Sequence, residues 1–176
     1  MRRQVDHMVH LVDDLLDMAR LAEGKVTLKL ERVLLADVVR EAVDMSMPLV
    51  EVGRHALDVK VPDAPLALRA DRHRVAQILS NLLNNAAKYT PPGGAIEIVA
   101  HIERSPDGAA RDEVAITVSD NGIGLSPDTL DTVFDMYAQA QSATTMAQGG
   151  LGVGLNLVQR LVKLHGGRVA AASAGV

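Results

Sequence analysis

The most informative stretch of this 176-residue sequence is Asn81-Leu-Leu-Asn-Asn-Ala-Ala-Lys-Tyr-Thr-Pro91. Apolar residues recur at helical spacing before and within it, so the stretch ends an amphipathic helix that stops at the prolines and glycines 91–94. On such a helix Asn81, Asn85 and Lys88 stand at i, i+4 and i+7 and therefore line one face. Amide oxygens are suitable ligands for a hard cation such as Mg²⁺, and a lysine beside them is suited to phosphate oxygens.

Taken alone, this face has a plain alternative, because asparagines are common on solvated surfaces near helix ends. Two glycine clusters further along favour a nucleotide site: Asp120-Asn-Gly-Ile-Gly124 and Gly149-Gly-Leu-Gly-Val-Gly154. The Asp120 carboxylate can accept a hydrogen bond from an exocyclic amine such as that of adenine, and glycines let the backbone approach a flat ring. The second cluster opens a helix at Gly152, and helix N-termini favour phosphate. We discard a dinucleotide fingerprint there, because no βαβ unit precedes the cluster.

The composition limits the class of protein. A hydrophobic content of 48% over 176 residues is enough for the core of one domain. The net charge of -4 provides no basic field, so nucleic acid is not expected as a partner. The absence of cysteine excludes disulfides and thiolate metal sites. No apolar run approaches the ~20 residues that a membrane-spanning helix needs.

Residues 2–22 are predicted to form one helix that carries an apolar seam of the coiled-coil type. The seam consists of Val5, Met8, Val9, Val12, Leu15, Leu16 and Ala19. No neighbouring helix in the sequence covers this seam. Its partner is a second copy of the chain through residues 5–19, a helix upstream, or the rest of the domain.

The remaining sequence alternates between predicted strands and helices. Strands are predicted over 26–33, 56–61, 66–70 and 168–172, and 95–104 and 113–119 form a hairpin. Helices are predicted over 35–52, from Asp71 to the 81–91 stretch, over 126–134 and over 152–165, with a loop at 136–148. Asp71 is expected to cap the central helix, because its short side chain can accept from first-turn amides. The pattern predicts an α+β fold: a two-layer α/β sandwich with a mixed, mostly antiparallel sheet.

Four segments together resemble, in order and spacing, the boxes of the catalytic and ATP-binding domain of sensor histidine kinases. This domain belongs to the superfamily of gyrase, heat-shock ATPases and MutL, with the Bergerat fold. The N box corresponds to 81–90, the first glycine box to 120–124, the F box to 134–138 and the second glycine box to 150–155. The resemblance covers residues 26–176, and four boxes in one order are highly specific.

The resemblance implies a role for each matching residue. Asn85, helped by Asn81, would hold Mg²⁺ against the triphosphate, and Lys88 would contact phosphate. Tyr89 would lie near the adenine or ribose, and Asp120 would bind the adenine amine. The other nucleotide-binding residues implied by the two glycine boxes are Gly122, Ile123, Gly124, Gly150, Leu151, Gly152, Val153, Gly154 and Leu155.

The resemblance also divides the chain. Residues 1–24 are expected to be the C-terminal part of the second helix of a dimerisation and phosphotransfer bundle. Residues 25–176 are expected to be the catalytic domain without its last strand. None of the six histidines is followed by Glu or Asp, as the phosphoacceptor of the family is. We therefore expect this chain to bind ATP but not to phosphorylate itself.

The function implied is transfer of the γ-phosphoryl group of Mg·ATP to a histidine on the helix bundle, for relay to a response-regulator receiver domain. A cytoplasmic kinase core is expected, whether or not the whole protein is membrane-anchored. Asn81 stands where hydrolysing members carry a glutamate, and an amide cannot act as a base near neutral pH. The alternative is a regulatory nucleotide-binding module without phosphotransfer, because 112–159 contains no Lys, Arg or His.

Overall fold

The computed structural model describes residues 16, 17, 19, 21, 26–104, 112–136 and 152–175. These residues belong to two compact units. The first unit is Leu30–Ile123, and the second combines Met1–Lys29 with Gly124–Val176. Each unit is described by itself.

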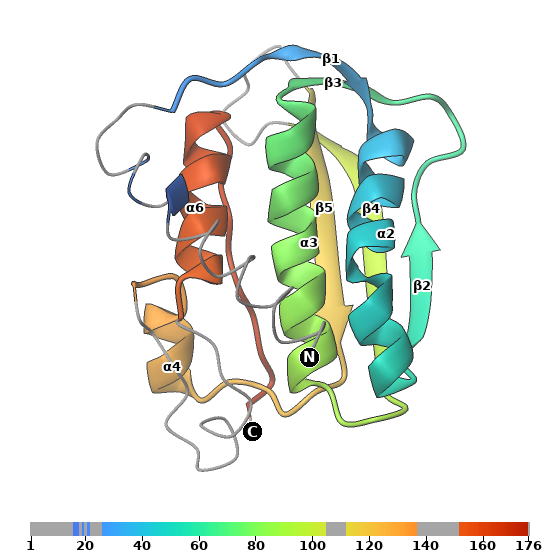
Figure 1. Ribbon diagram of the computed structural model, residues 1–176, viewed down its shortest axis with the longest axis vertical. Helices are drawn as coiled ribbons and strands as arrows, with labels where there is room; N and C mark the ends of the chain where they lie inside the picture. Colours follow the sequence, from blue (N-terminus) through green and yellow to red (C-terminus); the bar gives the residue numbers. More distant parts are fainter. Residues whose placement is uncertain are drawn as a thin grey trace. The chain divides into compact units, whose positions relative to one another are not determined.

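The first unit contains two small sheets (Figure 1). The larger has the strand order β2-β4-β5, formed by β2 (Ala56–Lys60), β4 (Ala95–Arg104) and β5 (Asp112–Asp120). Strand β2 runs parallel to β4, and β4 runs antiparallel to β5. The smaller is an antiparallel ribbon of β1 (Glu31–Leu34) and β3 (Ala67–Ala70). Two of the three described strand pairings are antiparallel, as expected for a mixed, mostly antiparallel sheet.

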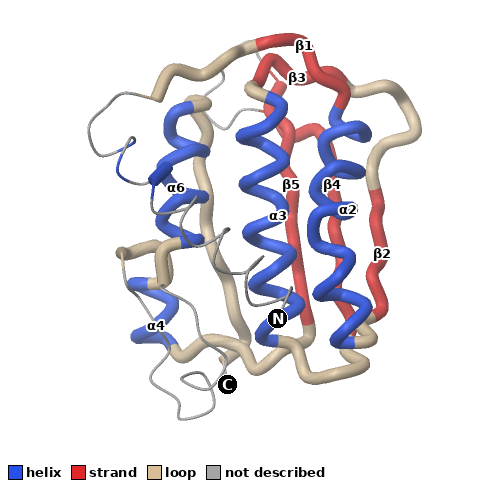
Figure 2. Tube along the Cα trace, viewed as in Figure 1, coloured by secondary structure: helices blue, strands red, loops and turns tan. Residues whose placement is uncertain are grey.

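Two long helices, α2 (Leu35–Gly53) and α3 (Arg72–Tyr89), lie against one face of the larger sheet (Figures 1 and 2). The sheet presents alternate residues of β4 to them, because side chains in a strand point to opposite faces in turn. Burying each large aliphatic side chain contributes about 1.5–3 kcal/mol. The most buried side chains of this helix–sheet core, all at 2% exposure or less, are Leu35, Val38, Val39, Ala42, Ala76, Leu79, Leu83, Ile96 and Ile98.

Helix α3 begins at the predicted cap. The Asp71 Oδ1 accepts a hydrogen bond from the Arg74 N–H at 3.1 Å, so a first-turn amide is satisfied. At the edge strand β2, the Lys60 ammonium hydrogen-bonds to Glu97 and to Asp58, which raises the pKa of Lys60 above its usual value. Charged side chains of this kind disfavour the pairing of an exposed edge strand with a strand of another molecule.

In the second unit, α4 (Pro127–Thr132) and α6 (Gly154–Leu164) are the two helices with assigned bounds. Ser126 caps α4 through a bond from the Thr129 N–H to its Oγ at 3.3 Å. Helix α6 ends at Leu164, and Gly166 follows its C-cap residue. The φ of +77° at Gly166 is in the left-handed region that glycine adopts without strain. No helix in the described part of the chain is long and apolar enough to cross a membrane.

Two predicted strands differ from the structure. The strand predicted over 26–33 is confined to Glu31–Leu34, because Glu31 pairs with Ala70 and the next partner, Asp71, is already the cap of α3. The strand predicted over 168–172 is wrong, since those residues belong to no strand. Their alanine-rich composition, with one β-branched residue, Val169, has low strand propensity.

The other element predictions agree with the described residues to within a few positions. This holds for the four helices and for the β4–β5 hairpin. The predicted N-terminal helix lies almost wholly outside the described residues, although positions 16, 17, 19 and 21 are helical. Of its apolar seam only Leu16 and Ala19 are described, and both are exposed. The rest of the seam, with most of the segment 5–19 through which a dimer was predicted, and the loop over 137–148 lie outside the described residues.

Candidate functional site

The polar face at the end of α3 presents amide oxygens. Asn81, Asn85 and Lys88 are all half-buried. The Asn81 Nδ2 donates to the Gln77 carbonyl at 3.2 Å, and this bond leaves the Asn81 Oδ1 available. The Asn85 side chain makes no hydrogen bond to any described residue. Two amide oxygens with no hydrogen-bond partner among the described residues fit a hard cation, which prefers oxygen ligands.

Lys88 and Tyr89 contact each other at the last turn of α3. The Lys88 Nζ donates to the Tyr89 Oη at 3.1 Å and lies 4.8 Å from the centroid of the ring. A cation over an aromatic face is attracted by the ring quadrupole. The ammonium is therefore held beside the ring, where it can also donate to a bound anion.

The end of α3 is joined directly to the loop after β5. The Tyr89 carbonyl accepts a hydrogen bond from the Ile123 N–H at 3.1 Å. The Asp120 Oδ1 accepts from the Thr90 Oγ1 at 3.4 Å and from the Gly122 N–H at 2.9 Å. Two motifs 30 residues apart thus form one junction, which places the carboxylate next to the polar helix end.

Gly122 makes this close approach possible. A Cβ atom on Gly122 would lie 2.6 Å from the Tyr89 carbonyl oxygen and 2.6 Å from the Asp120 Oδ1. Any larger residue would push the loop off the helix end. The Asp120 side chain is exposed, and its Oδ2 has no hydrogen-bond partner within the described residues. This second oxygen can accept a bond from a ligand while the first holds the loop.

The remaining predicted site residues belong to the second unit or lie outside the described residues. Gly124 has φ +69°, and a Cβ there would meet the Gly175 carbonyl oxygen at 2.1 Å. Gly152 has φ +67° and precedes the buried Val153, after which α6 begins at Gly154. Leu155 is half-buried in the first turn of that helix. The residues outside the description are Gly150 and Leu151.

Sequence reasoning did not assign a role to several residues that organise these segments. Thr90, buried to 5% exposure, orients Asp120, and the Asn121 Oδ1 accepts from the Ala95 N–H at 2.8 Å. In the second unit the Asn156 Nδ2 donates to the Phe134 carbonyl at 2.8 Å, which ties the F box to α6. The only available signal was their position: each is a polar residue inside or beside a predicted box.

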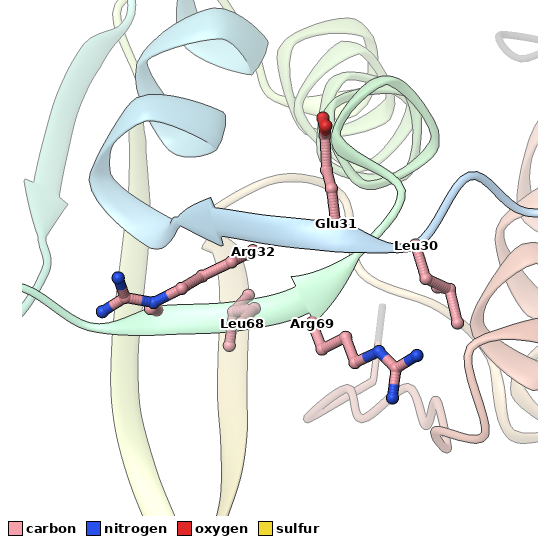
Figure 3. Close-up of a pocket in the computed structure, with 6 residues that line it drawn as sticks. Leu30, Glu31, Arg32, Leu68 and Arg69 are labelled. Carbon is pink, nitrogen blue, oxygen red and sulfur yellow. The ribbon is translucent and has the colours of Figure 1, made fainter.

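A separate hollow of about 430 Å³ lies on the β1–β3 ribbon (Figure 3). It contains none of the predicted site residues. Arg32 and Arg69 line it, but their guanidinium groups point away from each other, so they do not converge on one ligand. Within the described residues, no group of three or more His, Cys, Asp or Glu side chains could hold a metal ion. Within the described residues of the first unit, the candidate site is therefore the α3–β5 junction.

Comparison with known proteins identifies the family of this chain. Residues 70–175 match the family described as histidine kinase-, DNA gyrase B- and HSP90-like ATPases. The chain belongs to this ATPase family. The match begins at the end of β3 and includes α3 and the loop after β5. The resemblance to the catalytic domain of sensor histidine kinases is confirmed, and so is the α+β fold class.

Curated relatives within this family are much longer. The "Non-motile and phage-resistance protein" of Caulobacter vibrioides is 35% identical over 161 residues, which is 92% of this chain and 19% of that protein. Histidine protein kinase DivJ of the same organism is 35% identical over 167 residues, 93% of this chain and 26% of DivJ. The chain thus spans about a fifth to a quarter of these relatives. Among solved structures, full-length ShkA in complex with AMPPNP matches with a TM-score of 0.74 at 28% identity, covering 94% of this chain and 32% of that one.

Proposed function

We propose that this chain is the ATP-binding catalytic core of a two-component sensor histidine kinase. In the whole protein, the γ-phosphoryl group of ATP would move to a histidine outside this sequence and then to an aspartate of a response-regulator receiver domain. The observation that carries the proposal is the junction between Tyr89 and Ile123, which brings the amide-bearing helix face and Asp120 together. The family match and the AMPPNP complex of ShkA support it.

The adenine end of the nucleotide is assigned to the loop after β5. The Asp120 Oδ2 would accept a hydrogen bond from the exocyclic amine of adenine, while Oδ1 keeps its hydrogen bonds from Thr90 and Gly122. Gly122 and Ile123 provide backbone against which a flat ring can lie. An acceptor that a bound ring covers discriminates against bases without the matching donor, because the acceptor would then be left unpaired. We therefore assign the choice of adenine over guanine to Asp120.

The phosphate end is assigned to the polar face of α3. Asn85 and Asn81 would hold Mg²⁺ through their amide oxygens, and the bound ion would neutralise negative charge on the phosphate oxygens. Lys88 would donate to a phosphate from its place beside Tyr89. Asn81 provides no base for activating water, so phosphoryl transfer is favoured over hydrolysis. In the second unit, the glycine box at 150–155 leads into α6, and the main-chain N–H groups at a helix N-terminus favour phosphate.

The second candidate is a nucleotide-binding module that regulates without transferring phosphate. The absence of Lys, Arg and His from 112–159 favours it, because basic side chains there would stabilise charge on a transferring phosphoryl group. Transfer to a separately supplied helix bundle carrying an acceptor histidine distinguishes the two candidates. Phosphorylation of the bundle supports the kinase, whereas tight ATP binding without it supports the module.

The domain division remains part of the proposal. Residues 1–24 would be the end of the second helix of the dimerisation and phosphotransfer bundle, and 25–176 the catalytic domain. The partners would be that bundle, a receiver domain and, through 5–19, a second copy of the chain. We place this kinase core in the cytoplasm.

The test is calorimetric titration with ATP, with and without Mg²⁺. Asp120→Ala should weaken binding at least about tenfold, since it removes a charged hydrogen-bond acceptor. Asn85→Ala should abolish the Mg²⁺ dependence and retain part of the nucleotide affinity. Asp58→Ala is the matched control, because Asp58 is an exposed aspartate on β2 that contacts Lys60. A folded wild-type chain that binds no ATP at millimolar concentration would contradict the proposal.

A further inference from the structure

The last turn of α3 has carbonyl groups that cannot find their usual partners. In an α-helix the carbonyl of residue i accepts from the N–H of residue i+4. For Ala87 that residue is Pro91, and proline has no N–H. For Tyr89 it is Gly93, whose N–H donates instead to the Gly53 carbonyl at 2.8 Å. This turn therefore needs donors from elsewhere in the chain.

His55 supplies one of these donors. Its Nε2 lies 3.0 Å from the Ala87 carbonyl oxygen, 32 residues away in the sequence. A carbonyl can only accept, so the ring carries its proton on Nε2. The ring is buried to 9% exposure, and its Nδ1 has no partner within the described residues.

Gly53 leaves room for the His55 ring because glycine has no side chain. A Cβ atom on Gly53 would lie 2.0 Å from the His55 Nε2 and 2.4 Å from its Cδ2. Arg54 adopts a left-handed conformation with φ 54°, and the His55 N–H donates to the Val50 carbonyl at 3.0 Å. The chain thus turns tightly from α2 into β2, and this turn delivers the ring to the end of α3.

We propose that His55 is a positioning residue for the nucleotide site. The carbonyls on either side of Lys88 are both held by distant donors: that of Ala87 by His55 and that of Tyr89 by Ile123. Two fixed carbonyls set the rotation of the turn and hence the direction of the Lys88 side chain. This inference rests on the proposed function, because its consequence is the affinity for a nucleotide. His55 acts only through the Ala87 carbonyl and the turn behind it.

The test compares two substitutions that differ in hydrogen-bonding capacity. His55→Gln keeps a long side chain whose amide can donate to the Ala87 carbonyl, whereas His55→Leu keeps the bulk but has no donor. Binding of ATP with Mg²⁺ is measured by calorimetry on the whole chain, at a temperature where circular dichroism shows every variant folded. We expect His55→Leu to weaken binding about tenfold and His55→Gln to stay within about threefold of wild type.

The control separates positioning from general loss of stability. Val33→Ala removes a side chain of 6% exposure from β1, away from the end of α3. We expect it to lower the melting temperature while ATP affinity stays unchanged. If Val33→Ala weakens binding as much as His55→Leu at equal loss of stability, the positioning role is overturned.

Gly53→Ala is an independent route to the same result, which applies even if His55→Leu does not fold. The new methyl group occupies the place of the ring, so ATP affinity should fall about tenfold when His55 is present. In the His55→Leu background it should cause less than a further twofold loss. Unchanged ATP affinity in a folded Gly53→Ala variant would overturn the inference, and so would additive losses where the double variant folds.

The two hypotheses fail in different ways. A wild-type chain that is folded and does not bind ATP overturns the proposed function, and the inference with it. A wild-type chain that binds ATP while His55→Leu binds it equally well overturns the inference alone. Equal losses in His55→Gln and His55→Leu also overturn it, because the hydrogen bond would then not be the cause.

Discussion

The main-chain carbonyl of Tyr89 accepts a hydrogen bond from the N–H of Ile123 at 3.1 Å. This bond joins the last residue of α3 to the loop that follows β5. Tyr89 lies beside the lysine of the polar helix face, and Ile123 lies three residues after Asp120. A single backbone contact therefore sets the spacing between the groups assigned to phosphate and to adenine.

Gly122→Ala should open this junction. The added methyl group would lie 2.6 Å from the Tyr89 carbonyl oxygen, a contact that neither the backbone nor Asp120 can relieve without moving. We expect a loss of about 1–3 kcal/mol in the free energy of unfolding, as for other overpacked sites. ATP affinity should fall about tenfold because Asp120 is displaced together with the loop. Urea unfolding and calorimetry measure the two effects. Ser119→Ala, on exposed β5 surface, is the control, and equal behaviour of the two variants would contradict the prediction.

Thr90→Val should weaken nucleotide binding with little change in fold. Valine has nearly the shape of threonine but cannot donate to the Asp120 Oδ1, which lies 3.4 Å from the Thr90 hydroxyl. Losing one such hydrogen bond costs about 0.5–1.5 kcal/mol. We therefore expect the dissociation constant for ATP to rise about three- to tenfold. Thr90→Ser keeps the hydroxyl and should bind as wild type does. A serine variant as weak as the valine variant would assign the effect to packing instead.

The local features of this fold were predictable because they depend on short stretches of sequence. Helix α3 follows from its apolar spacing and from Asp71 and Pro91 at its two ends. The β4–β5 hairpin follows from two alternating runs separated by a turn. The four boxes were identified differently, by their resemblance in order and spacing to those of the sensor histidine kinase catalytic domain.

The features that sequence could not reveal depend on contacts between distant residues. His55 bonds to Ala87 across 32 positions, and nothing in the residues around His55 indicates this partner. The short β1 strand is a similar case: its length is set by the register with β3 and by the helix cap that follows. Tertiary pairing thus overrides the alternation that predicted a strand from residue 26.

Asn156→Ala should loosen the link between the F box and α6. The Asn156 side chain is buried to 8% exposure, its Nδ2 donates to the Phe134 carbonyl, and its Oδ1 accepts from the Arg160 Nε at 2.9 Å. Removing it leaves both groups without this partner, which costs about 1–3 kcal/mol. Hydrogen exchange should show faster opening of the first turns of α6. Gln159→Ala, a half-buried position on the same helix, should leave exchange nearly unchanged, and similar acceleration in both variants would count against the link.

Leu83→Ala should destabilise the first unit much more than Leu49→Ala. Leu83 is fully buried on α3, whereas Leu49 on α2 is 47% exposed. A buried leucine loses its transfer free energy and leaves a cavity, which costs about 2–5 kcal/mol, while surface substitutions stay within about 0.5 kcal/mol. Urea unfolding should show a lower midpoint for Leu83→Ala with an unchanged m-value, because the same surface is exposed on unfolding. Equal midpoints for the two variants would mean that α3 does not pack on the sheet through this face. The amide face opposite would then have no rigid support, since its orientation depends on that packing.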